Sequence, residues 1–275
     1  MRKRRVVATA LVYAALLAGL VLTLFPLVWM ISVSFMSATD STRFPLPLWP
    51  RTVTFEHYRT LFTQRDLARY LFNSTLLASV ITIISLLLNS TAGYAFAKFR
   101  FAGRDLLFRW LLAAMVIPGQ VAMLPLFLML KQMGLVNTYA GVVVPGMASI
   151  FGIFLMRQYA QSIPDSLLDA GRIDGASEWL IYWRLVLPLC KPILVTLAIF
   201  TFLGAWSDFM WPLIILTDDE LYTLPVALAN LLGEHVQDTE LMMAGAVLTL
   251  LPVMLLFLAL QKYYVEGLIL GGVKE

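Results

Sequence analysis

Long hydrophobic runs separated by short polar segments are the dominant pattern of this sequence. A helix that crosses roughly 30 Å of hydrocarbon needs about 20 apolar residues at about 1.5 Å each. The sequence contains no alternation of apolar and polar residues of the kind that marks strands of a membrane barrel. We therefore predict an all-α integral membrane protein that forms a single domain over residues 1–275. Its six transmembrane helices are predicted at residues 12–35, 71–97, 106–130, 139–155, 185–216 and 241–260.

The composition supports a membrane location. Hydrophobic residues make up 60% of the chain and charged residues 13%, against roughly 45–50% and 25% in soluble domains. A soluble fold of 275 residues with this composition would have to expose large apolar patches to water. A bilayer removes that problem because lipid tails solvate apolar side chains directly.

The N-terminal sequence MRKRR is basic and leads directly into the first hydrophobic run. A secretory signal peptide is the alternative interpretation, but its hydrophobic region is only about 7–15 residues long and ends at a small-residue cleavage site. The run here extends over residues 6–35, and no such site ends it. We predict that residues 1–11 stay in the cytoplasm and that the first helix is retained.

The distribution of Lys and Arg predicts the orientation in the membrane, because these residues concentrate in cytoplasmic loops. With six helices and a cytoplasmic N-terminus, 14 of the 20 basic residues lie on the inner side and six on the outer side. The outer segment 217–240 holds six acidic residues and no Lys or Arg. Both termini are therefore predicted to be cytoplasmic. The outer basic residues are Arg43, Arg51, Arg59, Arg65, Arg69 and Lys131.

Residues suited to metal or nucleotide chemistry are few. The chain has one cysteine, Cys190, and two histidines, His57 and His235, which disfavours a disulfide framework or a metal centre. No glycine-rich loop followed by Lys and Ser or Thr is present, so the chain lacks the phosphate-binding loop of an ATPase. A net charge of +3 is too small to indicate nucleic acid. We predict a non-enzymatic chain that binds no cofactor, metal or nucleic acid.

A cytoplasmic segment at residues 157–184, between the fourth and fifth predicted helices, is longer than a simple connection requires. Pro164 suits the first turn of a helix, where its missing N–H costs nothing. Asp165 complements the positive end of the helix dipole. The segment therefore predicts a short amphipathic helix from residue 164 to about residue 176. Its apolar stripe is formed by Ile163, Leu167, Ala170 and Ile173.

A second short helix is predicted after a break at Gly175. Asp174 precedes the break and is a good N-cap residue for a helix that begins near Ala176. Pro188 and Pro192 then reshape the entry into the fifth transmembrane helix.

Acidic residues on this helix pair favour a protein partner over the lipid surface. Helices that lie in the membrane interface favour Lys and Arg on their polar face. This segment instead carries four acids against Arg172 and Arg184. Because acids facing anionic headgroups are unfavourable, we expect the helix to lie in a groove of another protein. The acids are Asp165, Asp169, Asp174 and Glu178.

The same segment, PDSLLDAGRIDGASEWLIYWRLVLPLCKP, resembles the signature cytoplasmic loop of binding-protein-dependent ABC importer permeases. That signature has an acidic-Ala-Ala opening, a glycine a few residues later and a final Leu-Pro. Residues 169–171, Gly175 and residues 187–188 stand at these places. The family usually has Glu where Asp169 stands and Ala where Gly171 stands.

The resemblance extends over nearly the whole chain, specifically to the smaller six-span subunit of the maltose-type carbohydrate permeases. Members of that family commonly have Asn where Ser207 stands. The segments that carry the resemblance are TVTFEHYRTLF (52–62), NSTLLAS (73–79), AGYAFAKFRFAGRD (92–105), AWSDFMWPL (205–213) and GLILGGVKE (267–275).

The resemblance implies a type I ABC importer permease fold in the bacterial inner membrane and a carbohydrate as substrate. It implies two separate ATPase subunits that bind ATP and Mg, a second, nonidentical permease and an extracytoplasmic sugar-binding protein. The helix pair at 157–184 would be a coupling helix pair that docks on an ATPase. The residues expected at this contact are Pro164, Asp165, Leu167, Leu168, Asp169, Ala170, Gly171, Asp174, Gly175 and Ala176.

Asp208 is the one acid embedded in an otherwise apolar predicted helix. Carboxylates inside a membrane are costly and usually face a cavity or a partner. With Ser207 and the aromatic rings of Trp206 and Trp211 it could line a path for a sugar. A structural hydrogen bond between helices is the alternative interpretation.

Three other classes of membrane protein compete with the importer hypothesis. An ion-driven secondary transporter should show paired broken helices and several ionisable groups within the membrane, whereas only Asp208 qualifies. A membrane enzyme needs clustered polar catalytic residues near one interface, and the sequence shows no such cluster. A structural scaffold would not need an acidic docking segment.

Overall fold

The computed structural model describes residues 2–41, 47–234 and 238–272, which are helical or irregular and contain no strand. Arg43 and Lys274 of the charge count, His235 and the last three residues of the segment 267–275 lie outside these ranges. The chain divides into two compact units. One consists of residues 1–68 and 228–252, and the other of residues 69–227 and 253–275.

The first unit is built around the end of helix α1 (Arg2–Ser34). The Oγ atom of Ser34 lies 2.8 Å from the hydroxyl of Tyr58, and the Nε2 atom of His57 lies 2.8 Å from the carbonyl oxygen of Met36. Both partners belong to α3 (Glu56–Gln64), so this short helix is fixed to the chain that leaves α1. The unit also contains α2 (Ala38–Ser41) and parts of α14 (Leu224–Glu234) and α15 (Thr239–Gly272).

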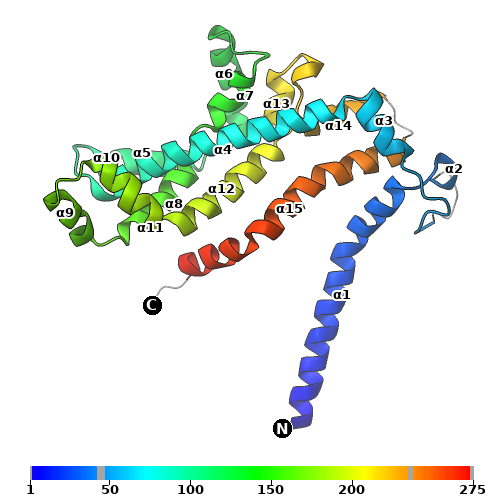
Figure 1. The fold of residues 1–275 in the computed structure, drawn as a ribbon, viewed down its shortest axis with the longest axis horizontal. Helices are drawn as coiled ribbons and strands as arrows, with labels where there is room; N and C mark the ends of the chain where they lie inside the picture. The colour runs from blue at the N-terminus through cyan, green and yellow to red at the C-terminus, as the bar shows by residue number, and fades with distance from the viewer. Residues whose placement is uncertain (1, 42–46, 235–237, 273–275) are drawn as a thin grey trace. The chain divides into compact units, whose positions relative to one another are not determined.

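The second unit is organised along α4 (Leu67–Lys98) (Figure 1). Short helices α9 and α10 lie beside the C-terminal end of α4 in this view. The further elements of the unit are α5 (Arg104–Ala114), α6 (Gly119–Gln132), α7 (Tyr139–Gly146), α8 (Ile150–Gln161), α9 (Asp165–Ile173), α10 (Glu178–Ile181), the π-helical turn η1 (Tyr182–Val186), α11 (Leu187–Leu189), α12 (Lys191–Trp206), α13 (Met210–Ile215) and the 3₁₀ turn η2 (Asp219–Leu221).

Three continuous helices among the described residues are long and apolar enough to cross a membrane. They are Thr9–Ser34, Leu67–Lys98 and Thr239–Ala259. Three bent helix pairs meet the same test when each pair is taken together. The pairs are α5 with α6, bent by 105°, α7 with α8, bent by 41°, and Glu178–Leu189 with α12, bent by 80°.

The bends correct the sequence prediction, which drew residues 106–130, 139–155 and 185–216 as continuous helices. Residues without helical hydrogen bonds or helical dihedral angles stand at the breaks. Pro118 has extended dihedral angles before α6, and Ser149 caps α8 by accepting a bond from the N–H of Gly152. Pro192 follows the bend at Cys190, and the helix that begins there ends at Trp206. Polar caps and prolines therefore divide apolar runs that length and hydropathy alone would join.

Polar side chains of α4 bind other parts of the second unit at several levels. Near its start, Asn73 donates to the carbonyl oxygens of Glu220 and Tyr222, both at 2.9 Å. Closer to its C-terminal end, Asn89 accepts a 2.9 Å bond from the N–H of Ser149. Asn73 is about 25 residues from the end of α4, or roughly 37 Å at about 1.5 Å per residue. The helix therefore contacts partners along a length greater than the hydrocarbon thickness.

Gly93 allows α4 and α8 to approach closely. A Cβ atom at this position would lie 2.6 Å from the Cβ of Met156 and 2.9 Å from the backbone nitrogen of Arg157. Because neither atom is the free end of a flexible side chain, we expect Gly93→Ala to destabilise the protein by about 1–3 kcal/mol. Thermal unfolding in detergent should show a midpoint lower by roughly 2–4 °C for each kcal/mol.

Gly204→Ala is the matched control for this prediction, because nothing lies within 4 Å of a Cβ added to Gly204 in α12. The control is expected to unfold at the native temperature or slightly above it, since Ala is the better helix former. Equal midpoints for Gly93→Ala and Gly204→Ala would contradict the close packing of α4 on α8.

Candidate functional site

Helix α9 occupies the centre of the predicted coupling segment and runs from Asp165 to Ile173. Pro164 is its N-cap with extended dihedral angles, one position before the first helical turn where the sequence placed it. Gly175 ends the helix with a positive φ of 81°. The N–H of Gly175 bonds to the oxygen of Arg172 and the N–H of Ala176 to that of Gly171, both at 3.0 Å. These are the two bonds of a Schellman motif, and a glycine is favoured at its left-handed position.

The prediction that Asp174 caps the second helix is wrong. Asp174 is the C-cap of α9, and Ser177 is the N-cap of α10 with its hydroxyl oxygen accepting from the N–H of Leu180. The Schellman motif explains the difference, because it uses residues 174–176 to end α9. The second helix therefore begins at Glu178 instead of near Ala176.

Leu168 does not contribute to the exposed contact surface as predicted. Its side chain is 1% exposed and packs in an apolar cluster with Ile163, Ile181 and Val186. Adjacent residues of a helix point in different directions, so Leu167 and Asp169 face outward while Leu168 is buried. Ile173 is 85% exposed. The other nine predicted contact residues are at least partly exposed: Pro164, Asp165, Leu167, Asp169, Ala170, Gly171, Asp174, Gly175 and Ala176.

Arg172 joins the two short helices of this segment. Its guanidinium donates to Asp169 of the same helix and to Glu178 of α10, both at 2.7 Å. These two bonds raise the pKa of Arg172 above its ordinary value. Asp169 keeps an exposed side chain beside this pair. Arg172 is the single basic residue on this surface and the acids outnumber it. The surface therefore keeps a negative charge that a basic partner can bind.

The predicted sugar path is only partly supported by the geometry. Trp206 is 1% exposed and stacks on Phe202, with 6.0 Å between ring centroids. Trp211 is 6% exposed, and its Nε1 donates to the carbonyl oxygen of Gly141 at 3.0 Å. Trp206 stacks on a ring of its own helix α12, and Trp211 packs in an apolar cluster with residues of α4 and α7, so neither ring is open within this chain. Their burial within this chain disfavours stacking of these two rings on a sugar, which stays a prediction.

Ser207 and Asp208 lie in the break between α12 and α13. Ser207 is exposed and Asp208 is partly exposed. The carboxylate of Asp208 accepts a 3.4 Å bond from the backbone N–H of Trp211, in the first turn of α13. This bond is local and satisfies the N-terminus of α13, so it differs from the bond between helices that the sequence analysis gave as the alternative.

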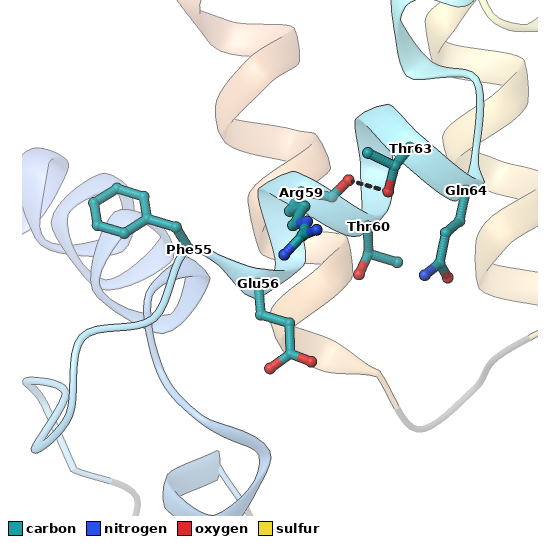
Figure 2. A pocket seen from close by; sticks show the side chains of 6 residues that line it. All are labelled: Phe55, Glu56, Arg59, Thr60, Thr63 and Gln64. Atoms are coloured by element: carbon teal, nitrogen blue, oxygen red, sulfur yellow. Dashed lines mark hydrogen bonds between the residues drawn. The ribbon is translucent and has the colours of Figure 1, made fainter.

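A polar hollow of about 590 Å³ on α3 was not singled out from the sequence. Figure 2 shows its lining side chains projecting from one short helix and the residue before it. The Thr63 hydroxyl donates to the carbonyl oxygen of Arg59 at 2.8 Å, which holds part of this face in place. The lining residues are Phe55, Glu56, Arg59, Thr60, Thr63 and Gln64. Their spacing of three and four residues would mark one helix face, but nothing in the sequence distinguishes it from an ordinary solvated surface.

Residues 89–269 match the family described as "Binding-protein-dependent transport system inner membrane component". The chain belongs to this family. The match includes the whole coupling segment and confirms the resemblance found in the sequence. This match favours the importer hypothesis over an ion-driven transporter, a membrane enzyme or a scaffold.

Individual relatives of this permease are named for sugar transport. The arabinooligosaccharides transport system permease protein AraQ of Halalkalibacterium halodurans is 38% identical, over 92% of each chain. The lactose transport system permease protein LacG of Rhizobium radiobacter is 31% identical, over 95% of each chain.

The fold of the permease matches solved structures of an alginate transporter. One is the crystal structure of a bacterial ABC transporter involved in the import of the acidic polysaccharide alginate. A chain of it superimposes with a TM-score of 0.85 and 25% identity, over 96% of this permease and 98% of that chain. A second alginate transporter structure, in complex with an alginate pentasaccharide-bound periplasmic protein, has a TM-score of 0.66 at 16% identity. It covers 93% of this permease and 94% of that chain, and shows the fold alone.

The sequence analysis did not identify two residues of the permease that make long-range contacts in the fold. Asn73 binds the backbone carbonyl oxygens of Glu220 and Tyr222, and Lys98, the last residue of α4, binds the start of α9. Both lie in segments that carry the family resemblance, NSTLLAS and AGYAFAKFRFAGRD. Lys98 entered the prediction only as one of the inner positive charges, because a single sequence does not reveal which lysine becomes buried.

Proposed function

We infer that this permease is the membrane-spanning subunit of an ATP-binding-cassette importer that carries a carbohydrate into the bacterial cell. The observation that carries the inference is α9, a short helix with an exposed acidic and apolar face and one buried anchor, Leu168. It lies within the region that matches the transport family. The named substrates of relatives are arabinooligosaccharides and lactose, which support a carbohydrate as the class of solute.

We propose six membrane crossings with both termini in the cytoplasm. Three continuous helices and three bent pairs supply the required number. The contacts of Asn73 and Lys98 lie roughly 37 Å apart along α4, which exceeds a hydrocarbon thickness of about 30 Å. Residues 217–224 of the outer segment and the coupling segment 157–184 are thus assigned to opposite sides of the membrane.

ATP hydrolysis is assigned to two separate ATPase subunits that bind ATP and Mg, since this sequence has no phosphate-binding loop. Each ATPase would receive a docking helix in a cleft on its surface. Closure of the two ATPases on nucleotide would move the docked helices and shift the spans between inward-facing and outward-facing states. This chain then acts as the transmitting element and carries out no reaction itself.

The remaining partners follow from the maltose-type resemblance. A second, nonidentical permease would complete the pathway, and an extracytoplasmic sugar-binding protein would deliver the solute. The family's description as a binding-protein-dependent transport system supports the binding-protein partner. The acidic outer turn at Asp218, Asp219 and Glu220 and the polar hollow of α3 are exposed surfaces that such a protein could contact.

Asp208 is expected to act through its hydrogen bond and not through its charge. Asp208→Asn keeps an acceptor oxygen for the N–H of Trp211 and should transport within about twofold of the native rate. Asp208→Ala removes the acceptor and should lower the stability by about 1 kcal/mol. Transport into vesicles and thermal unfolding of both variants test this. Loss of transport in Asp208→Asn at native stability would instead place the carboxylate on the sugar path.

The proposed function is tested by purifying the tagged permease from its native membrane in mild detergent and identifying every protein that accompanies it. The expected result is an ATP-binding-cassette ATPase together with a second permease. The sugar-binding protein encoded with these partners can then be screened against oligosaccharides to name the solute. A chain that purifies alone or only with copies of itself would overturn the importer hypothesis.

A further inference from the structure

Lys98 connects the end of a membrane-spanning helix to the beginning of the coupling helix. It is the last residue of α4. Its Nζ atom donates to the carbonyl oxygen of Ile163 at 2.5 Å and to Oδ1 of Asp165 at 2.6 Å. The two acceptors stand just before α9 and at its first residue, more than 60 positions further along the chain.

Because the Lys98 side chain is buried, water cannot easily replace its two hydrogen-bond acceptors. The side chain of Lys98 is only 7% exposed, whereas that of Asp165 is 78% exposed. A buried ammonium group is costly unless it is paired and hydrogen-bonded. Both acceptors belong to the start of the coupling segment. Moving α9 away from α4 would therefore leave the ammonium group of Lys98 without these partners.

The helix ends strengthen the contact. Lys98 stands at the C-terminal, negative end of α4, and Asp165 stands at the N-terminal, positive end of α9. The hydrogen bond from Lys98 lowers the pKa of Asp165 below its ordinary value of 3.8. Because the pKa of Asp165 is lowered, its carboxylate is fully ionised at any pH above the ordinary pKa. The ion pair is lost only when the pH falls through the lowered pKa. The contact is therefore present at any physiological pH.

Other contacts hold α10 to α4 but do not replace this one at α9. Tyr94 donates to Glu178 of α10 at 3.3 Å, and the hydroxyl of Ser90 lies 2.6 Å from that of Tyr182 in η1. The ion pairs of Arg172 stay within the segment itself, between α9 and α10. Apolar packing of Ile163 and Leu168 anchors the beginning of α9, and Lys98 adds the polar contact that joins it to α4.

We propose that Lys98 is a positioning residue that transmits the movement of the docking helix α9 to the membrane-spanning helix α4. This proposal rests on the proposed function. The short bonds at the first turn of α9 make the two helices move as one body. Asn73 ties the opposite end of α4 to the outer segment, so a displacement of α9 reaches the outer side along a single continuous helix.

The test uses the whole importer in lipid nanodiscs, with its ATPases, second permease and binding protein. A cysteine placed at the exposed Asp219 reports on the outer segment through its reaction with a maleimide, while the native Cys190 is buried. Labelling is compared without nucleotide and with Mg-ATP and vanadate. In the importer with Lys98, trapped nucleotide is expected to change the labelling rate. In Lys98→Met the nucleotide should still be trapped, but the change should shrink by about fivefold or more.

Three further variants sharpen the result. Lys98→Arg keeps the charge and should restore most of the change. Asp165→Asn removes the ion pair at an exposed position while leaving the carbonyl of Ile163 as acceptor, and should give an intermediate change. Lys131→Met makes the same substitution at an exposed lysine of α6 and should behave as the native chain.

A full labelling change in Lys98→Met would overturn the proposal. So would a native response in Asp165→Asn if Lys98→Met fails to assemble, because Asp165→Asn removes the ion pair while the carbonyl oxygen of Ile163 still accepts from Lys98. A uniform loss of assembly, trapping and stability that Lys98→Arg does not rescue would assign Lys98 a structural role only. Failure of the native importer to trap nucleotide would contradict the proposed function itself.

Discussion

Gly175→Val is expected to weaken the binding of the ATPase to the permease by about tenfold, because the docking helix can no longer end as it does in the structure. The φ of Gly175 is 81°, a region that a β-branched residue essentially never occupies. The strain is about 1–3 kcal/mol, and 1.4 kcal/mol corresponds to a tenfold change in an equilibrium constant. It lowers the population of the docking-competent form and hence the apparent affinity. The measurement is titration of purified permease complex with the purified ATPase in detergent.

Gly175→Asn is the matched control, since Asn tolerates the left-handed conformation far better than Val. No atom of the described residues lies within 4 Å of a Cβ added to Gly175, so the Cβ of either variant has open space. We expect Asn to retain most of the affinity. Equal losses for Val and Asn would show that the ATPase requires close approach to the glycine, and that the backbone conformation is not what limits docking.

Asn73→Leu is expected to destabilise the permease by about 2–4 kcal/mol, the sum of several hydrogen bonds lost from one buried amide. Asn73 is buried, and besides its two carbonyl partners its Oδ1 accepts a 2.8 Å bond from the hydroxyl of Tyr139. Leucine has a similar size but leaves the two carbonyl oxygens and the Tyr139 hydroxyl without their bonds to this side chain. Unfolding in detergent by increasing sodium dodecyl sulfate measures the change, and proteolysis of the outer segment 217–224 should accelerate.

Thr75→Val on the same helix is the control for Asn73. Thr75 is exposed, and its hydroxyl bonds only locally, to the carbonyl oxygen of Leu71 at 2.7 Å. Its loss should change the stability by less than about 0.5 kcal/mol. A comparable effect of the two substitutions would contradict the role of Asn73 as the anchor of the outer segment.

Local signals in the sequence were sufficient to predict where the coupling helix lies. Pro164, Asp165 and Gly175 act within one or two turns of their own position, and the structure places a helix start and end beside them. Asp174 and Ser177 are both good caps, and only the bonds of residues 174–176 decide which one begins the second helix. That choice depends on backbone geometry that residue type does not determine.

Tertiary contacts account for what the sequence did not predict. Hydropathy treats Trp206 and Trp211 alike whether they line a path or pack between helices, and the structure buries both. Leu167 and Leu168 are adjacent and chemically identical, yet only Leu168 is buried. Lys98 is one of 20 basic residues in the sequence. It differs from the others because the fold places segment 163–165 beside its ammonium group.

Photo-crosslinking from Ile173, the most exposed apolar residue of α9, tests most directly whether this helix docks on an ATPase. A benzoyl-phenylalanine at this position, irradiated in the native membrane, should form a product that mass spectrometry identifies as an ATP-binding-cassette ATPase. The same group at Leu124, an exposed apolar residue of α6, should form none with that protein. Products of residue 173 that contain only lipid would contradict the account, because α9 would then lie on the membrane surface and dock on no ATPase.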